Sequence, residues 1–327
     1  MILFYINYNF VAKLYKQNYL KQIKNEKSMS KKIKSTTLTK YDYLAKNIHA
    51  EEIEVKGWKY SYTEFDDKGN TTLEIKYDLN GKVEDKTKNK YDKHGYLVEE
   101  VTYLDGREIA EHKTYERDAE GNIIKAFKHY NDGTKDTIEY EYNPDGELIK
   151  KTIIDSYGEV EAIETFKFKN GNIILNEKYE YDELMSKDIF VYDEKGNITE
   201  NEKWTEDDGS VKFKSFYNEN NNMVKELIYN KDEKLVAKSE YSYNNNNKIT
   251  EVVEETPHGT NITKIKYDDK GNAIAQVEIN KAGEVNNSVE RKFNENNDVI
   301  ETKVFIDFHG RDINQEYVLK YEYKYFE

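Results

Sequence analysis

Apolar and polar residues alternate along most of this chain with the two-residue period of β-strands. In one stretch Leu73, Ile75 and Tyr77 alternate with the polar residues between them, and similar runs recur to the end of the sequence. Successive side chains of a strand point to opposite faces of a sheet, so many of these segments are expected to bury one face and to expose the other. The pattern predicts an all-β protein.

A turn motif interrupts the alternation at regular intervals. It reads aromatic, Asp or Asn, two variable residues and Gly, and its ten full or degenerate copies start at residues 65, 91, 117, 142, 168, 192, 217, 243, 267 and 293, about 25 residues apart on average. Asp or Asn opens such a turn by accepting hydrogen bonds from backbone N–H groups, and Gly closes it where φ must be positive. The regular spacing predicts tandem hairpin repeats.

The closing position of the turn is filled by Gly or by Asn. Asn is the residue that best tolerates a left-handed backbone after Gly, so its presence there indicates backbone chemistry rather than catalysis. A second turn follows 11 to 13 residues later in most units, marked by glycines such as Gly106 and Gly310. The predicted structural turn residues of the first kind are Gly69, Gly95, Gly121, Gly146, Gly196, Asn221, Asn247, Gly271 and Asn297.

The hairpins are predicted to stack into an extended, twisted β-sheet or solenoid. A single hairpin is only marginally stable, so each unit must pack on its neighbours. Residues 65–316 are expected to hold about ten hairpin repeats, and residues 317–327 form a C-terminal capping strand. Residues 35–64 are expected to form an N-terminal cap or degenerate repeat, with a candidate short helix around 41–52, and residues 1–34 a Lys-rich tail, disordered or helical.

The first residues of the chain bear on its location. Residues 1–12 are apolar but too short to span a bilayer, and they lack the basic region and the cleavage site of a secretory signal. We interpret residues 1–28 as an extension ahead of a natural start at Met29, or as a disordered tail. Without a signal peptide or a lipidation cysteine, a cytoplasmic location is favoured, and a secreted or cell-surface location is the alternative.

The charge and the cysteine content limit the kinds of partner and of chemistry that this chain can have. The absence of cysteine excludes disulfides, thiolate metal sites and a cysteine nucleophile. Residues 1–40 hold nine Lys and one Glu, which gives them a net charge of +8. The whole chain has a net charge of −14, so residues 41–327 carry −22. A body this acidic repels nucleic acid. We expect no nucleic-acid partner, no integral membrane segment, and a monomer or a weak edge-to-edge oligomer.

No catalytic or metal-binding pattern rises above chance. Adjacent acids such as Glu99-Glu100 and Glu254-Glu255 point to opposite faces of a strand, and with 64 acidic residues such pairs are expected. The six histidines are scattered without metal-ligand spacing, and the acidic turns lack the alternating ligands of a calcium loop. The chain is therefore predicted to be non-enzymatic, with no cofactor and no metal.

The repeated tyrosines are the candidate binding feature. They recur at a fixed phase, and they could either stack in the core or line an exposed platform for a sugar or a peptide. Core stacking is favoured, because the chain has little else to bury. The candidate platform residues are Tyr77, Tyr91, Tyr142, Tyr192, Tyr217, Tyr243 and Tyr267.

The turn motif, together with Tyr-x-Tyr endings such as Tyr140-Glu141-Tyr142, resembles the RHS/YD-repeat family over about residues 65–323. Members of that family form extended β-sheet solenoids that can curl into hollow shells around toxin domains, and many are secreted or surface proteins. The family's Gly-Arg is mostly Gly-Asn here, and no effector domain follows the repeats.

The sequence thus predicts a non-catalytic repeat scaffold that binds a protein or carbohydrate partner through an extended β surface. The alternative is a structural shell or immunity-type component associated with a toxin or secretion system. A carbohydrate-active enzyme is a third, more distant hypothesis.

Overall fold

The computed structural model describes residues 31–45, 53–307 and 314–327, which form one antiparallel sheet of 22 strands. The strands are β1 (Ile33–Ala45), β2 (Ile53–Phe65), β3 (Thr71–Tyr77), β4 (Val83–Tyr91), β5 (Leu97–Leu104), β6 (Glu108–Arg117), β7 (Ile123–His129), β8 (Lys135–Tyr142), β9 (Leu148–Ile154), β10 (Val160–Lys169), β11 (Asn172–Glu180), β12 (Glu183–Tyr192), β13 (Ile198–Thr205), β14 (Gly209–Tyr217), β15 (Met223–Tyr229), β16 (Leu235–Tyr243), β17 (Ile249–Thr256), β18 (Gly259–Tyr267), β19 (Ala273–Asn280), β20 (Val285–Phe293), β21 (Val299–Ile306) and β22 (Gln315–Tyr325). The all-β class predicted from the alternation is confirmed.

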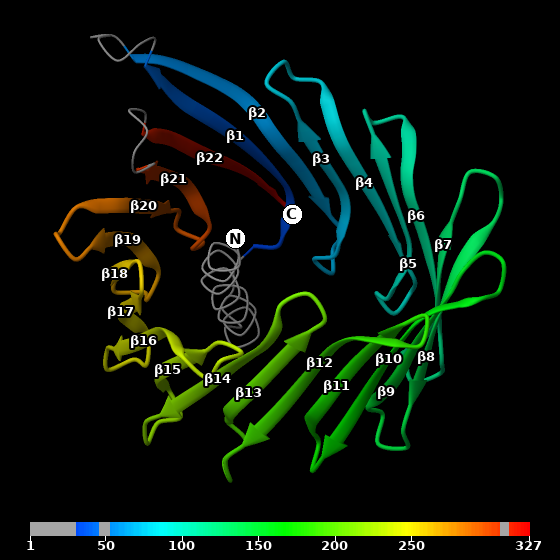
Figure 1. The fold of residues 1–327 in the computed structure, drawn as a ribbon. Coiled ribbons are helices and arrows are strands. Elements are labelled where there is room, and N and C mark those ends of the chain that lie inside the picture. The colour runs from blue at the N-terminus through cyan, green and yellow to red at the C-terminus, as the bar shows by residue number, and fades with distance from the viewer. Residues whose placement is uncertain (1–30, 46–52, 308–313) are drawn as a thin grey trace.

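The sheet closes on itself. Each strand pairs with the next one along the chain, and β1 also pairs with β22, from Ile33 opposite Tyr325 to Tyr43 opposite Glu316. Figure 1 shows the strands following one another round a ring, with the blue β1 lying beside the red β22. The molecule is a closed 22-stranded barrel, so the prediction of an extended sheet or solenoid is wrong.

Regular β-bulges help to explain why the hairpins curl into a barrel. In the hairpin after β12, Val191 pairs with Glu200 and Tyr192 pairs with Ile198, which leaves Thr199 as an extra residue. The same one-residue shift follows the first turn of the other repeats, as in β4–β5, β8–β9, β14–β15 and β20–β21. Each bulge bends its strand and increases the local twist. Several hairpins at the opposite rim carry a similar shift, as in β3–β4 and β15–β16, so bends at both rims contribute to closure. Closure leaves no free strand edge in the described sheet.

The candidate helix around residues 41–52 is wrong where the structure describes it. Residues 41–45 are extended in β1, and Tyr41 pairs with Gly57 on one side and Val318 on the other. Pairing on both edges holds this segment in the sheet. Residues 46–52, the tail before residue 31 and Gly310 lie outside the described residues, and the division of the chain into tail, cap and repeats stays a prediction.

The turn after β12 shows how the motif works. The Oδ1 atom of Asp193 accepts hydrogen bonds from the backbone N–H groups of Lys195, at 2.9 Å, and of Asn197, at 2.8 Å. The side-chain amide of Asn197 donates to the Oδ2 atom of Asp193 at 2.9 Å, and Gly196 has a φ of 83°. The residue after Gly is therefore part of the turn, because its amide binds the second carboxylate oxygen.

These turn carboxyls are expected to make the stability of the barrel depend on pH. Hydrogen bonds from the side chains of Asn122 and Asn197 lower the pKa values of Asp118 and Asp193, respectively. A carboxyl with a lowered folded-state pKa stabilises the fold above its unfolded pKa, about 3.9 for Asp, and that stability is lost as the pH falls toward the folded value. The free energy of unfolding is therefore expected to fall below about pH 4.

Urea unfolding at pH 7 and pH 3.5 measures this effect. In a variant in which four of the turn aspartates become asparagine, the loss at low pH is expected to shrink, because an amide oxygen accepts the two backbone N–H hydrogen bonds of the turn at either pH. Asn218 already opens one turn in this way. If the free energy of unfolding fell equally at low pH in both proteins, the turn carboxyls would not be the cause of the pH dependence. The four substitutions are Asp78→Asn, Asp92→Asn, Asp118→Asn and Asp193→Asn.

Candidate functional site

The register of the barrel divides its side chains into two faces. Residues paired across antiparallel strands point to the same side, so the faces can be followed round the ring from strand to strand. One face carries eight of the eleven buried residues of the described chain, among them Ile228, Ala237 and Tyr241. Side chains converge on the concave side of a closed sheet, so we assign this face to the inside of the barrel.

The inner face is polar as well as apolar. Along β13 to β19 it carries charged and hydroxyl groups between its apolar residues. A barrel interior of this composition favours water over lipid or a dry core. These polar residues are Lys203, Glu226, Ser239, Glu254, Thr263 and Glu278.

The outer face carries most of the ion pairs. They join lysine and glutamate on neighbouring strands and are at least partly open to solvent, so each contributes at most about 1 kcal/mol. Both faces of the wall are therefore polar. The outer pairs are Lys90 with Glu99, Lys125 with Glu139, Lys150 with Glu141, Lys187 with Glu177, Lys212 with Glu202, Lys214 with Glu200, Lys238 with Glu255, Lys264 with Glu251 and Lys292 with Glu301.

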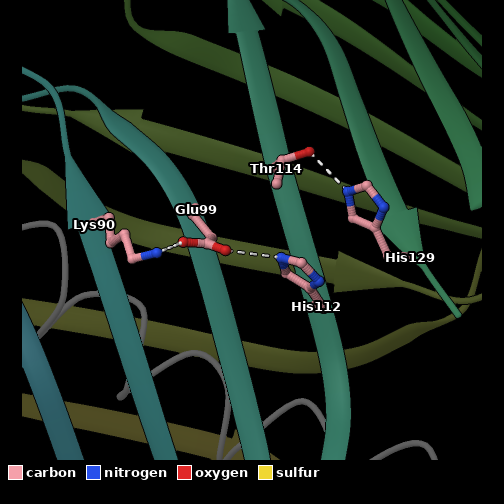
Figure 2. Close-up of polar contacts among 5 residues, drawn as sticks. All are labelled: Lys90, Glu99, His112, Thr114 and His129. Carbon is pink, nitrogen blue, oxygen red and sulfur yellow. Dashed lines mark hydrogen bonds and ion pairs between the residues drawn. The ribbon is translucent and has the colours of Figure 1, made fainter. Parts of the chain in front are cut away.

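Two histidines meet on the outer face of β6 and β7. Figure 2 shows Glu99 between Lys90 and His112, with His129 bound to Thr114 on the next strand. The Nε2 atom of His112 lies 3.0 Å from the Oε1 atom of Glu99, and the two imidazole centroids are 4.6 Å apart. The five side chains form two hydrogen-bonded groups across four strands, and the contact between the two imidazole rings joins them.

The histidine pair was missed from the sequence, where all six histidines read as scattered. His112 and His129 are 17 residues apart in the chain but pair directly across β6 and β7. Counting outward from the turn at Gly121 would have placed them opposite each other if the bulge at Ile124 had been known. No group of three or more His, Asp or Glu side chains in the described residues, this pair included, is placed to hold a metal ion.

Six of the seven repeated tyrosines lie at one rim of the barrel, half-buried, with their hydroxyl groups directed to the backbone, and Tyr77 lies at the opposite rim. Each of these six donates a hydrogen bond to the carbonyl oxygen of the first or second residue of a strand in the preceding repeat. That residue starts a bulged hairpin, so the tyrosine ties one unit to the next. The bonds run from Tyr91 to Thr71 (2.8 Å), Tyr142 to Ile123 (3.0 Å), Tyr192 to Ile173 (2.7 Å), Tyr217 to Ile198 (2.9 Å), Tyr243 to Met223 (2.6 Å) and Tyr267 to Ile249 (2.8 Å).

Arginine takes this place where the motif lacks a tyrosine. Arg117 stands at the first position of its motif, and its guanidinium donates to the carbonyl oxygen of Leu97 at 3.4 Å. Tyr77, the remaining platform candidate, accepts a hydrogen bond at its hydroxyl from the Nζ atom of Lys59 at 3.1 Å. The binding-platform role of the tyrosines stays a prediction, and their hydroxyls are engaged within the wall.

The nine predicted turn residues all have positive φ, from 56° at Asn247 to 93° at Gly121. Non-glycine residues rarely adopt this conformation, except for Asn and Asp. The turns with Asn keep the hydrogen bonds of those with Gly, since the N–H of Asn221 donates to the carbonyl of Asn218 at 3.0 Å. These residues shape the rim and carry no chemistry of their own.

Comparisons with known proteins identify no characterised family. A family model described only as an uncharacterised protein matches residues 162–263, and no curated protein matches. Among solved structures, a porin-like protein from Bacteroides uniformis is similar over 90% of this chain and 99% of its own, at 7% identity and a TM-score of 0.29. A porin-like protein from Bacteroides vulgatus covers the same shares at 12% identity and a TM-score of 0.19.

These findings correct the resemblance to the RHS/YD-repeat family, which neither the matching model nor the solved structures support. The repeat scaffold and the toxin-associated shell or immunity component depended on that resemblance and on an open sheet, and closure of the barrel removes both. At these TM-scores the likeness to porin-like proteins carries no argument about the activity of this chain.

The expected location and membrane relation are corrected as well. The predictions of a cytoplasmic location and of no integral membrane segment are withdrawn; the two solved structures reported above are porin-like proteins. Among residues 31–45, 53–307 and 314–327, no helix is long and apolar enough to cross a membrane.

Proposed function

We propose that this chain forms a channel of the porin type, in which hydrophilic solutes pass along the inside of the barrel. The observation that carries the proposal is the pairing of β1 with β22, which closes a wall of 22 strands. Barrels of about 16 to 18 strands already leave an aqueous channel. A 22-stranded wall encloses more room than its inward side chains fill. The proposal assigns no catalytic step to the protein.

The charge of the chain favours cations as the solutes. The chain beyond residue 40 carries a net charge of −22, and the inner wall presents Glu226, Glu254 and Glu278. A pathway lined by one sign of charge raises the local concentration of the opposite ion. We therefore expect cations to pass more readily than anions.

The outer face sets the most demanding condition on this function. Outer-membrane barrels carry an apolar band about 25 Å tall, and one lysine at the bilayer midplane costs about 2–4 kcal/mol. Here ion pairs such as Lys187 with Glu177 and Lys212 with Glu202 occupy the outer wall. The barrel can enter a bilayer only if the lysine and glutamate of each pair stay neutralised by each other. Insertion of the barrel into lipid is therefore the first step to measure.

Flotation with liposomes, followed by conductance across planar bilayers in a KCl gradient, tests the proposal. The purified chain is expected to float with the lipid, to give stepwise conductance, and to show a reversal potential on the cation side. Glu254→Gln on the inner wall is expected to reduce the cation preference, and Glu202→Gln, with the same loss of charge on the outer face, is the matched control. A chain that neither floats nor conducts contradicts the channel.

A solute carrier is the second candidate, and the charged outer face is the observation that favours it. In that case the same polar interior would hold its solute rather than pass it across a bilayer. The two candidates differ in one result, because a carrier retains a radiolabelled solute through gel filtration without conducting across a bilayer.

A further inference from the structure

Two carboxylates on the inner wall have no counter-charge in contact with them. Glu226 on β15 is only 6% exposed, and no described residue forms a hydrogen bond or an ion pair with it. Glu254 on β17 also has neither kind of partner among the described residues. A buried carboxylate without a partner is strongly unfavourable, because it has lost the water that stabilises its charge.

The register brings these two side chains into one row. Glu226 pairs with Ser239 on β16, and Ser239 pairs with Glu254, so all three residues point into the barrel from adjacent strands. Ser239 is 8% exposed. Glu226 and Ser239 are therefore buried in the inner wall, and Glu254 at the end of the row is half-buried.

A buried phenol beside the row also lacks a partner. Tyr241 lies two residues after Ser239 on the same face of β16 and is 6% exposed. Its hydroxyl oxygen is buried and forms no hydrogen bond of normal geometry with the described residues, and the side chains of Ser239, Glu226 and Glu254 act on it electrostatically. Buried polar groups in proteins are almost always hydrogen-bonded. Two buried groups without well-formed partners, Glu226 and Tyr241, lie beside the half-buried Glu254, which indicates that a ligand supplies the missing contacts.

The ligand has to be a cation that donates hydrogen bonds. A single metal ion does not fit, because the described residues contain no group of three acidic or histidine side chains placed to bind one. Glu226 and Glu254 lie two strands apart, which places their backbones about 10 Å from each other. Glu278, two strands further on, acts electrostatically on Glu254. Carboxylates spaced in this way match a linear molecule with several ammonium groups.

Other groups limit the length of the strip. The positive charge of Lys203 on β13 acts on Glu226 from one side. At the other end the side-chain amide of Asn286 donates to the Oε1 atom of Glu278 at 3.0 Å, so that carboxylate is already engaged. The segment from Glu226 to Glu254 is the part that lacks partners.

We propose that the inner-wall row formed by Glu226, Ser239 and Glu254, together with Tyr241, binds a linear polyamine. One ammonium group lies at each carboxylate, and one N–H donates to the hydroxyl oxygen of Tyr241. The site rests on the assignment of the inner face and deepens the proposed cation preference, but binding does not depend on conductance.

Isothermal titration calorimetry of the full chain with spermidine tests this site without a bilayer. Saturable binding is expected, with a dissociation constant at least tenfold higher in Glu226→Gln and higher also in Tyr241→Phe. Glu202→Gln removes one charge from the outer face and is expected to stay within twofold of the unmodified chain. Because Glu226→Gln removes a buried charge, its melting temperature is expected to be equal or higher, so a loss of binding is not a loss of folding.

Three results would overturn the site. They are the absence of spermidine binding to the unmodified chain, equal weakening by Glu202→Gln, and displacement of spermidine by equimolar Mg²⁺, which would indicate binding to the acidic surface as a whole. A chain that binds spermidine but gives no conductance would retain this site and lose the channel function, so the two proposals can fail separately.

Discussion

Deletion of residues 314–327 is expected to abolish cooperative folding of the whole barrel. This segment contains β22, which pairs with β21 on one side and with β1 on the other. Its removal frees two strand edges at once and opens the ring, and free edges promote aggregation. Size-exclusion chromatography and thermal unfolding of the truncated chain are expected to show aggregates and no sharp transition.

An open solenoid would respond differently to the same deletion. It would lose one terminal strand, and the remaining repeats would unfold as before, since each contacts only its neighbours. In such a sheet β1 and β22 would also lie roughly 100 Å apart, from a strand spacing of about 4.8 Å. A sharp transition in the truncated chain would therefore contradict closure.

A cross-link provides a second measurement of closure in the full chain. Thr37 and Glu322 are direct partners across β1 and β22, and the chain has no cysteine of its own. Thr37→Cys with Glu322→Cys is expected to form an intramolecular disulfide under mild oxidation. Thr37→Cys with Glu200→Cys, where Glu200 lies on the distant strand β13, is the control that stays reduced.

Replacement of Tyr217 by alanine is expected to lower the free energy of unfolding by about 2–3 kcal/mol, less than the roughly 3–5 kcal/mol for removing a fully buried aromatic ring, because this ring is half-buried. Tyr217→Phe keeps the ring and removes only the hydrogen bond to Ile198, for an expected loss of about 1 kcal/mol. Chemical denaturation measures both values. The difference between the two variants separates the packing of the ring from its hydrogen bond.

The control for this series is a tyrosine that makes little contact. Tyr157 is 92% exposed in a turn between β9 and β10, and Tyr157→Ala is expected to change stability by no more than about 0.5 kcal/mol. If Tyr217→Phe were as stable as the unmodified chain, the tyrosine ladder would not couple neighbouring repeats through its hydroxyl groups.

Local features of this fold could be predicted from the sequence because their causes are local. The Asp-x-x-Gly turns follow from hydrogen bonds within five residues and from the positive φ at the closing position, as at Gly196. The strands between them follow from the two-residue alternation. The preference for Gly-Asn was visible in the sequence, but its reason, the amide of Asn197 binding the carboxylate of Asp193, required the structure.

Closure and the inner-wall site could not be predicted because their causes are not local. Whether the hairpins stay open or close depends on the sum of many bulges and on the match between β1 and β22, which lie at opposite ends of the chain. The two faces can be assigned only when the register is known, since one bulge moves every later side chain to the other face. Glu226 and Glu254 are 28 residues apart, and only the register makes them neighbours in a row.

Because the barrel is built from hairpin repeats, its diameter can change only by the addition or loss of whole hairpins. One unit contributes two strands, so gain or loss of a unit alters the circumference by roughly 10 Å and the diameter by about 3–4 Å, while antiparallel closure is preserved. The tyrosine and the bulge of a unit contact only the adjacent unit, so an inserted copy carries its own connections. Duplication of about 25 codons would then add one hairpin, which widens the barrel and leaves the contacts between the other hairpins unchanged.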